Sequence, residues 1–383
     1  MKPVRSHLAS AWRAGLLPLL PLLALALPAA PARADSLEDN FNTLWEVLWD
    51  QRGTPRQASR WEGSINYRVS GLDLAENRGR AAEALREAAA ATGLSINDVT
   101  DSPGQPAQLE LITVPDDDPS VPANSACVAF STNRPNWALD KATIRMRRKQ
   151  AWYCVRHEVM HAMGLRGHPS GLTILGYLSG RRDRYLELDL LMLRTWYSGA
   201  MTLGATPLEA MVVLGNAAAG EPSQGLSTEE ARRRVAAFMA NCVEQLKALA
   251  TGKGGVPAIV LRSGRASEAQ MRNAARESAY FLGLAYLRGT GVDKDDGQAG
   301  VWLKAGAEAG HPPSQVMWGR ALASGRGVPA DPVAAYTWFA TATRAGNSVG
   351  KPDMERLERT LSPAQLEQAR AAAATAHVSP ATP

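Results

Sequence analysis

The last third of the chain repeats itself with a period of 36 residues. Gly289-Thr290-Gly291-Val292 recurs as Gly325-Arg326-Gly327-Val328. The same offset relates Gly283 to Gly319, Ala285 to Ala321, Asp295 to Asp331, Ala299 to Ala335, Trp302 to Trp338 and Gly310 to Gly346. A period in the mid-thirties with helical spacing is typical of stacked helix pairs, because each pair buries its apolar face against the next. The sequence therefore predicts a short all-α solenoid.

The solenoid segment, residues 267–350, carries a G-x-G-V loop and an A-x-x-W helix in each copy. With these motifs it resembles the SEL-like branch of tetratricopeptide-type repeats. The resemblance implies a surface for a protein partner, for example an envelope protein. The alternative is that two repeats only cap the preceding domain, since so short an array offers little concave surface. A closing helix over 363–376 and a tail complete residues 351–383.

A second motif, H-E-x-x-H, begins at His157. On a helix, His157 and His161 lie one above the other, so both imidazoles can reach one Zn²⁺ ion. Glu158 is rotated by about 100° from His157 and can act as the catalytic base without binding the metal. Gly164 can end the helix and turn the chain back toward the ion.

The turn after Gly164 makes His168 the candidate third metal ligand. Here the sequence resembles the metzincin signature H-E-x-x-H-x-x-G-x-x-H, with one residue extra. The signature places the third ligand at Gly167, and a bulge at this glycine can absorb the offset. The fallback third ligands are acidic: Asp183, Glu187 and Asp189.

The segment 173–177 looks like the Met-turn below a metzincin zinc site. Leu175 stands where methionine is expected, and Tyr177 offers a hydroxyl to the site or packs in the core. More widely, residues 127–213 resemble a poorly characterised family of exported bacterial proteins with a zincin-like helix. Many of its members have a degraded metal motif, whereas this chain keeps both histidines and the glutamate.

Hydrophobic periodicity predicts the elements around these motifs. Strands are expected over 61–69, 109–114, 127–130 and 142–146, and helices over 37–49, 77–92, 149–163, 187–197, 206–214 and 227–249. This order predicts an α+β zincin-like domain, a small sheet plus the zinc-binding helix, followed by the solenoid. We expect the domain and its helical extension over 35–250 and a glycine-rich linker over 251–266.

The chain begins with a basic leader, an apolar run over 16–27 and Ala32-Arg33-Ala34. This pattern predicts a cleavable signal peptide over 1–34, or an uncleaved anchor, and hence a periplasmic or secreted protein of a Gram-negative bacterium. Removing four Lys/Arg lowers the net charge from +5 to +1, since 38 basic and 37 acidic residues remain. A near-neutral exported chain gives no basis for nucleic-acid binding. No later apolar run is long enough to cross a bilayer.

Three cysteines follow the leader. In an oxidising compartment we predict a bridge between Cys127 and Cys154, because both flank the segment with the metal motif. Cys242 lies in a helical stretch and is expected to be a buried free thiol. The alternative is that all three are reduced.

Two functions fit these predictions. The first is an exported zinc-dependent peptidase that acts on a protein or peptide substrate and uses Glu158 as base and the repeats to recruit a substrate or partner. The second is a non-enzymatic envelope scaffold, in which the histidines hold a structural metal or a site that has lost turnover.

Overall fold

The computed structural model describes residues 36–176, 181–256 and 266–376. The predicted signal peptide over 1–34, Tyr177 and most of the predicted linker over 251–266 lie outside these ranges. Among the described helices, none combines the length and the apolar character that a bilayer span requires.

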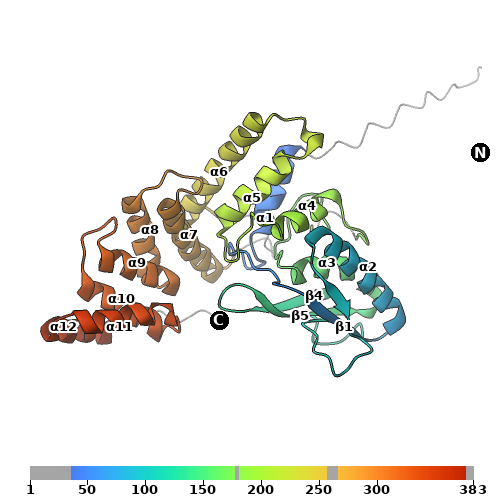
Figure 1. The fold of residues 1–383 in the computed structure, drawn as a ribbon, viewed down its shortest axis with the longest axis horizontal. Helices are drawn as coiled ribbons and strands as arrows, with labels where there is room; N and C mark the ends of the chain where they lie inside the picture. The colour runs from blue at the N-terminus through green and yellow to red at the C-terminus, as the bar shows by residue number, and fades with distance from the viewer. Residues whose placement is uncertain (1–35, 177–180, 257–265, 377–383) are drawn as a thin grey trace, which may run out of the picture. The chain divides into compact units, whose positions relative to one another are not determined.

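Five strands in the N-terminal part of the chain form a mixed sheet (Figure 1). They are β1 (Ile65–Gly71), β2 (Ile96–Asp98), β3 (Leu109–Val114), β4 (Cys127–Asn133) and β5 (Leu139–Arg147). The spatial order is β2-β1-β3-β5-β4, and only β4, at one edge, is antiparallel to its neighbour.

This architecture corrects the α+β expectation to an α/β domain with a small mixed sheet. The parallel neighbours β1 and β2 need a crossover, which α2 (Leu74–Thr92) provides. The four predicted strands are all present. The sequence pattern does not predict β2, because three residues are too short to show alternation.

The sheet and its helices enclose one hydrophobic core. Helices α2 and α3 (Ala151–Ala162) pack against the strands. The core-facing positions of the strands alternate with partly exposed ones and include Ile65, Leu109 and Ile144, all fully buried. Three further helices surround this core: α1 (Leu37–Val47), α4 (Glu187–Trp196) and α5 (Pro207–Ala219).

The C-terminal part is entirely helical (Figure 1). After α6 (Thr228–Ala250) its helices are α7 (Glu268–Arg288), α8 (Asp296–Glu308), α9 (Pro312–Ser324), α10 (Pro332–Arg344), α11 (Lys351–Thr360) and α12 (Pro363–Thr375). The 36-residue period reappears in the packing. A Cβ on Gly283 would lie 2.6 Å from Leu303, and one on Gly319 would lie 2.7 Å from Phe339. Glycine at both places therefore lets a large side chain of the next helix approach closely.

Helix α7 joins the two regions. Its buried residues Phe281 and Leu282 belong to the core that also contains the sheet, whereas Leu287 packs against the core of the following repeats. The glycine-rich loop after α7 also lies against α6. A Cβ added to Gly291 in this loop would lie 3.1 Å from the side chain of Met239 in α6.

Candidate metal centre

The histidines of the H-E-x-x-H motif lie on the last two turns of α3. The helix ends at Ala162 with Met163 as its C-cap, and Gly164 then takes a φ of 105° that a side chain would strain. A Cβ at Gly164 would also lie 2.0 Å from the carbonyl oxygen of Ser59. Glycine is therefore required for the turn that brings His168 back to the helix.

The three histidines converge on one point. The Nε2 atom of His161 lies 3.2 Å from that of His157 and 3.1 Å from that of His168, and the remaining Nε2–Nε2 distance is 3.2 Å. A tetrahedral zinc ion with bonds of about 2.0–2.1 Å separates its nitrogen ligands by about 3.3–3.4 Å. The donor set and its spacing therefore fit zinc with one position open. Within the described residues, these three histidines form a group whose ligand atoms all lie within 4.8 Å of one another, close enough to hold one metal ion.

Main-chain carbonyls orient two of the rings. Nδ1 of His157 donates to Ile174 O at 2.8 Å, and Nδ1 of His161 donates to Leu165 O at 2.6 Å. With hydrogen on Nδ1, the lone pair of each Nε2 points to the common centre. The side-chain amide of Gln51 lies 3.2 Å from Nδ1 of His168. No sequence signal singles out Gln51, because it is separated from the motif by more than a hundred residues.

Burial, followed by the neighbouring His157, lowers the pKa of His161 to about 3. Its ring is therefore neutral at pH 7, which is the form that binds metals. Glu158 is also buried, at 3% exposure, and it lines the same cleft as the three histidines. A carboxylate in this position can exchange a proton with a reactant in the cleft.

The fallback ligands lie elsewhere. Asp189 is fully buried and accepts hydrogen bonds from the amides of Ile174 and Leu186, at 3.1 and 2.8 Å, and from the Thr173 hydroxyl. It therefore holds the turn whose Ile174 carbonyl orients His157. Asp183 and Glu187 are exposed and are not part of the histidine cluster.

The extra residue of the motif packs against α1. The amide of Gly167 donates to Val47 O at 3.0 Å, and a Cβ on this glycine would lie 2.4 Å from Glu46 O. Ser170 binds the Glu46 carboxylate through its amide and hydroxyl, at 2.6 and 2.7 Å. The end of α1 thus supports the loop that carries His168.

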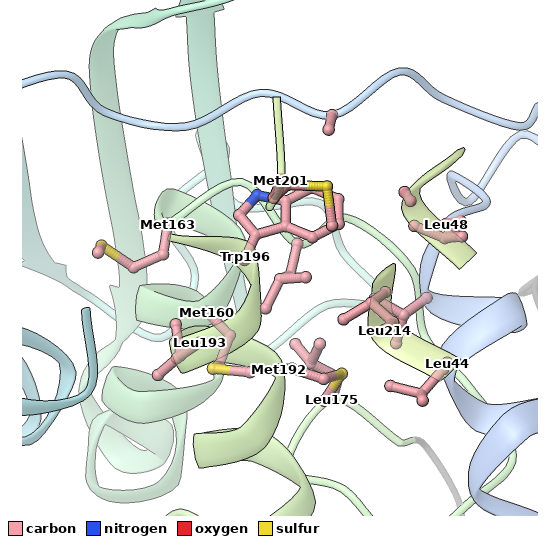
Figure 2. Close-up of a cluster of buried hydrophobic side chains, with 14 of the residues drawn as sticks. Leu44, Leu48, Met160, Met163, Leu175, Met192, Leu193, Trp196, Met201 and Leu214 are labelled. Atoms are coloured by element: carbon pink, nitrogen blue, oxygen red, sulfur yellow. The ribbon is translucent and has the colours of Figure 1, made fainter. Parts of the chain in front are cut away.

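Leu175, which directly follows Ile174, packs among other apolar side chains. Figure 2 shows Leu175 in a cluster with Met160 and Met192, and all three are fully buried. Leu175, which stands where the resemblance expects a methionine, is therefore part of the hydrophobic core. Beside the cluster, Tyr197 donates a hydrogen bond to Met163 O at 2.9 Å and fixes the end of α3.

The predicted disulfide is confirmed. Cys127 at the start of β4 is bonded to Cys154 in α3, with a Cα–Cα distance of 6.1 Å. The bond ties the edge strand to the helix that carries the histidines. Cys242 is free and buried, as predicted, and its burial raises the pKa of the thiol.

A cleft of about 900 Å³ lies in front of the histidines, lined by residues of β4, the 122–126 loop, α3 and the 166–168 loop. Five arginines line it, Arg52, Arg147, Arg166, Arg181 and Arg182, together with only three acidic residues, Asp50, Asp116 and Glu158. This basic character does not follow from the sequence pattern, because the arginines come from segments far apart in the chain.

The helical part has a recognisable sequence family. The Sel1 repeat family matches residues 276–311 and 312–347. Residues 276–347 are two Sel1 repeats. The matched boundaries confirm the 36-residue period and the predicted repeat type. No match was found among curated proteins.

Two solved structures are similar to the chain. One is a protective antigen of uropathogenic Escherichia coli strains with an SLR fold: 23% identity over 53% of this chain and 42% of that chain, with a TM-score of 0.26. The other is a Sel1 repeat protein from Oxalobacter formigenes. It is 26% identical, the match covers 32% of this chain and 88% of that chain, and the TM-score is 0.21. The chain spans less than half the length of the first structure. The zincin resemblance of residues 127–213 rests on the motif residues alone and stays a prediction.

Proposed function

We propose that this chain is a zinc-dependent peptidase that uses its Sel1 repeats to bind a protein partner or substrate. The observation that carries the proposal is the convergence of three Nε2 atoms, 3.1–3.2 Å apart, beside the buried Glu158. Three imidazole nitrogen ligands, an open position and an adjacent carboxylate are the parts of a hydrolytic zinc site.

His157, His161 and His168 would hold the metal. Bound zinc would supply Lewis acidity, which polarises a peptide carbonyl and activates water. Glu158 then takes the proton of the attacking water at its carboxylate and returns it to the leaving amine. The carbonyls of Ile174 and Leu165 keep two of the imidazoles in the tautomer that this arrangement needs.

The edge strand β4 supports a peptide as the substrate. Among the described strands only β5 pairs with it, and its residues Val128, Ala129 and Ser131 line the cleft in front of the histidines. An extended peptide can add to such an edge through main-chain hydrogen bonds. The disulfide at Cys127 anchors this edge to the zinc-binding helix.

We place the protein outside the cytoplasm, in the periplasm or beyond it. The leader over residues 1–34 motivates this, and the Cys127–Cys154 disulfide supports it, because such bonds persist in oxidising compartments.

The test of the peptidase uses Glu158→Gln in the full-length chain. This variant should bind one equivalent of zinc with wild-type affinity and lose at least about a hundredfold in turnover of a denatured protein substrate, because the proton acceptor is gone. Mass spectrometry of the products and metal analysis give the two readouts. Wild-type turnover by the Glu158→Gln variant would rule out Glu158 as the catalytic base.

The second candidate is a scaffold that binds an envelope protein without hydrolysing it. The Sel1 match favours this candidate, because such repeats generally present protein-binding surfaces. Metal analysis of purified protein separates the two. Folded protein without stoichiometric zinc after dialysis against zinc-containing buffer would favour the scaffold.

A further inference from the structure

Arg166 is a half-buried cation in the loop between the second and third histidines. Its guanidinium donates to the Ser131 hydroxyl at 3.0 Å and lies 3.4 Å from the Asn133 side-chain oxygen, both in β4. Both partners are neutral. Among the described carboxylates, none forms an ion pair with Arg166, whereas Arg56, Arg134 and Arg156 each have a carboxylate partner.

One acidic neighbour, Asp50, is already engaged. Asp50 pairs with Arg56, with 2.6 Å between the carboxylate and Nη2, and accepts the amides of Arg52 and Thr54 at 2.9 and 3.0 Å. Asp116, which also lines the cleft, pairs with Lys149 at 3.3 Å. The positive charge of Arg166 is therefore not balanced by a direct partner, although burying a guanidinium is costly unless a counter-ion approaches.

The position of Arg166 suggests which anion approaches. It lies two residues before His168 and touches the C-terminal half of β4, so it borders both the metal centre and the free sheet edge. A peptide extended along this edge would pass Arg166 close to the metal. A planar guanidinium binds a carboxylate through two parallel hydrogen bonds, which gives it both charge and shape selectivity.

We infer that Arg166 is a specificity-determining residue that binds a carboxylate of the peptide lying along β4. This inference rests on the proposed function in that it needs a peptide in the cleft, but it does not need the peptide to be cut. The carboxylate belongs either to an Asp or Glu side chain or to the C-terminus of the peptide, and the chemistry at Arg166 is the same for both.

The test measures peptide binding to full-length Glu158→Gln protein, with and without one equivalent of zinc. The probes are fluorescein-labelled decapeptides of alanine and glycine with Glu, Gln or Lys at each central position in turn, read by fluorescence anisotropy. At one position Glu should bind about tenfold tighter than Gln, and Lys more weakly than Gln. Peptides that end at that position, with a free or an amidated C-terminus, distinguish a terminal carboxylate from a side-chain carboxylate.

The variants locate the effect. Arg166→Ala should reduce the preference for Glu over Gln to less than about twofold while leaving the affinity for the Gln peptide unchanged. Arg166→Lys should keep part of the preference, and Arg166→Glu should shift it toward the Lys peptide. The matched control is Arg134→Ala, because Arg134 is an exposed arginine near the same strand end that pairs with Asp140.

The inference is overturned if Arg166→Ala keeps the full preference, if it weakens the Glu and Gln peptides equally, or if no position prefers Glu. Hydrolysis of the same peptides by the wild-type chain is measured separately. If the chain binds the Glu peptide selectively but does not cleave it, the carboxylate site at Arg166 is supported and the proposed peptidase activity is rejected.

Discussion

The main-chain carbonyl of Ile174 lies 2.8 Å from Nδ1 of His157. The amide of the same residue donates to the buried carboxylate of Asp189 at 3.1 Å. Asp189 therefore acts on the histidine cluster indirectly, through the backbone turn that sets the orientation and tautomer of one imidazole.

Asp189→Ala should lower the affinity for zinc by about tenfold to a hundredfold, because the turn loses its anchor and the ring loses its fixed orientation. Competition against a zinc-chelating dye measures the change. The control is Asp183→Ala, which removes an exposed carboxylate from the same segment and should leave the affinity unaltered. An unchanged affinity in the Asp189 variant would show that the turn does not support the metal.

His168→Ala should lower the affinity for zinc far more than Asp189→Ala does, because it removes one of three nitrogen ligands. The same dye competition compares the two variants directly. If Asp189→Ala had the larger effect, the third ligand would have to be reassigned to Asp189.

Gly167→Ala should destabilise the chain by about 1–3 kcal/mol and weaken zinc binding, since the new methyl group would overlap backbone atoms of Glu46 and Val47. Urea unfolding and dye competition give the two quantities. Gly199→Ala is the matched control, because a Cβ there meets no atom within 4 Å. Equal effects of the two substitutions would contradict the role assigned to the contact with α1.

Replacing both Cys127 and Cys154 by alanine should lower the free energy of unfolding by about 3–4 kcal/mol, because the bond closes a loop between positions 27 residues apart. The midpoint of urea unfolding measures the loss. A Cys242→Ala chain with the disulfide intact is the comparison, and it should lose clearly less.

Cys242 should resist iodoacetamide in the folded chain at pH 8, because burial raises the pKa of its thiol and leaves almost no thiolate. Mass spectrometry should find one labelled cysteine after unfolding without reductant and three after unfolding with reductant. Rapid labelling of the folded chain would contradict the buried environment.

The strongly periodic parts of the sequence predicted the structure best. The strand over 109–114 has the predicted ends, and the repeat period recurs in the packing of Gly283 and Gly319. The strand order could not be predicted. The strand β2 is too short to give a periodic signal, and β1 pairs with β3, which lies far from it in the sequence.

At the site, the sequence predicted residues that share one local motif. His157, Glu158 and His161 follow from helix geometry, and the glycine turn accounts for the return of His168. The supporting contacts of Gln51 and Asp189 did not follow, because they depend on how distant loops pack around the rings. For the same reason the acidic fallback ligands could not be eliminated from the sequence.

The position of α7 has a consequence for dissecting the protein. Its residues Phe281 and Leu282 complete the apolar interior that contains the sheet. A shortened chain that stops after α6 would expose this interior to water and invite aggregation. A chain that starts at α7 would expose the apolar face of α7, with Phe281 and Leu282, to water. The two halves are therefore better separated by point substitutions in the full chain than by truncation.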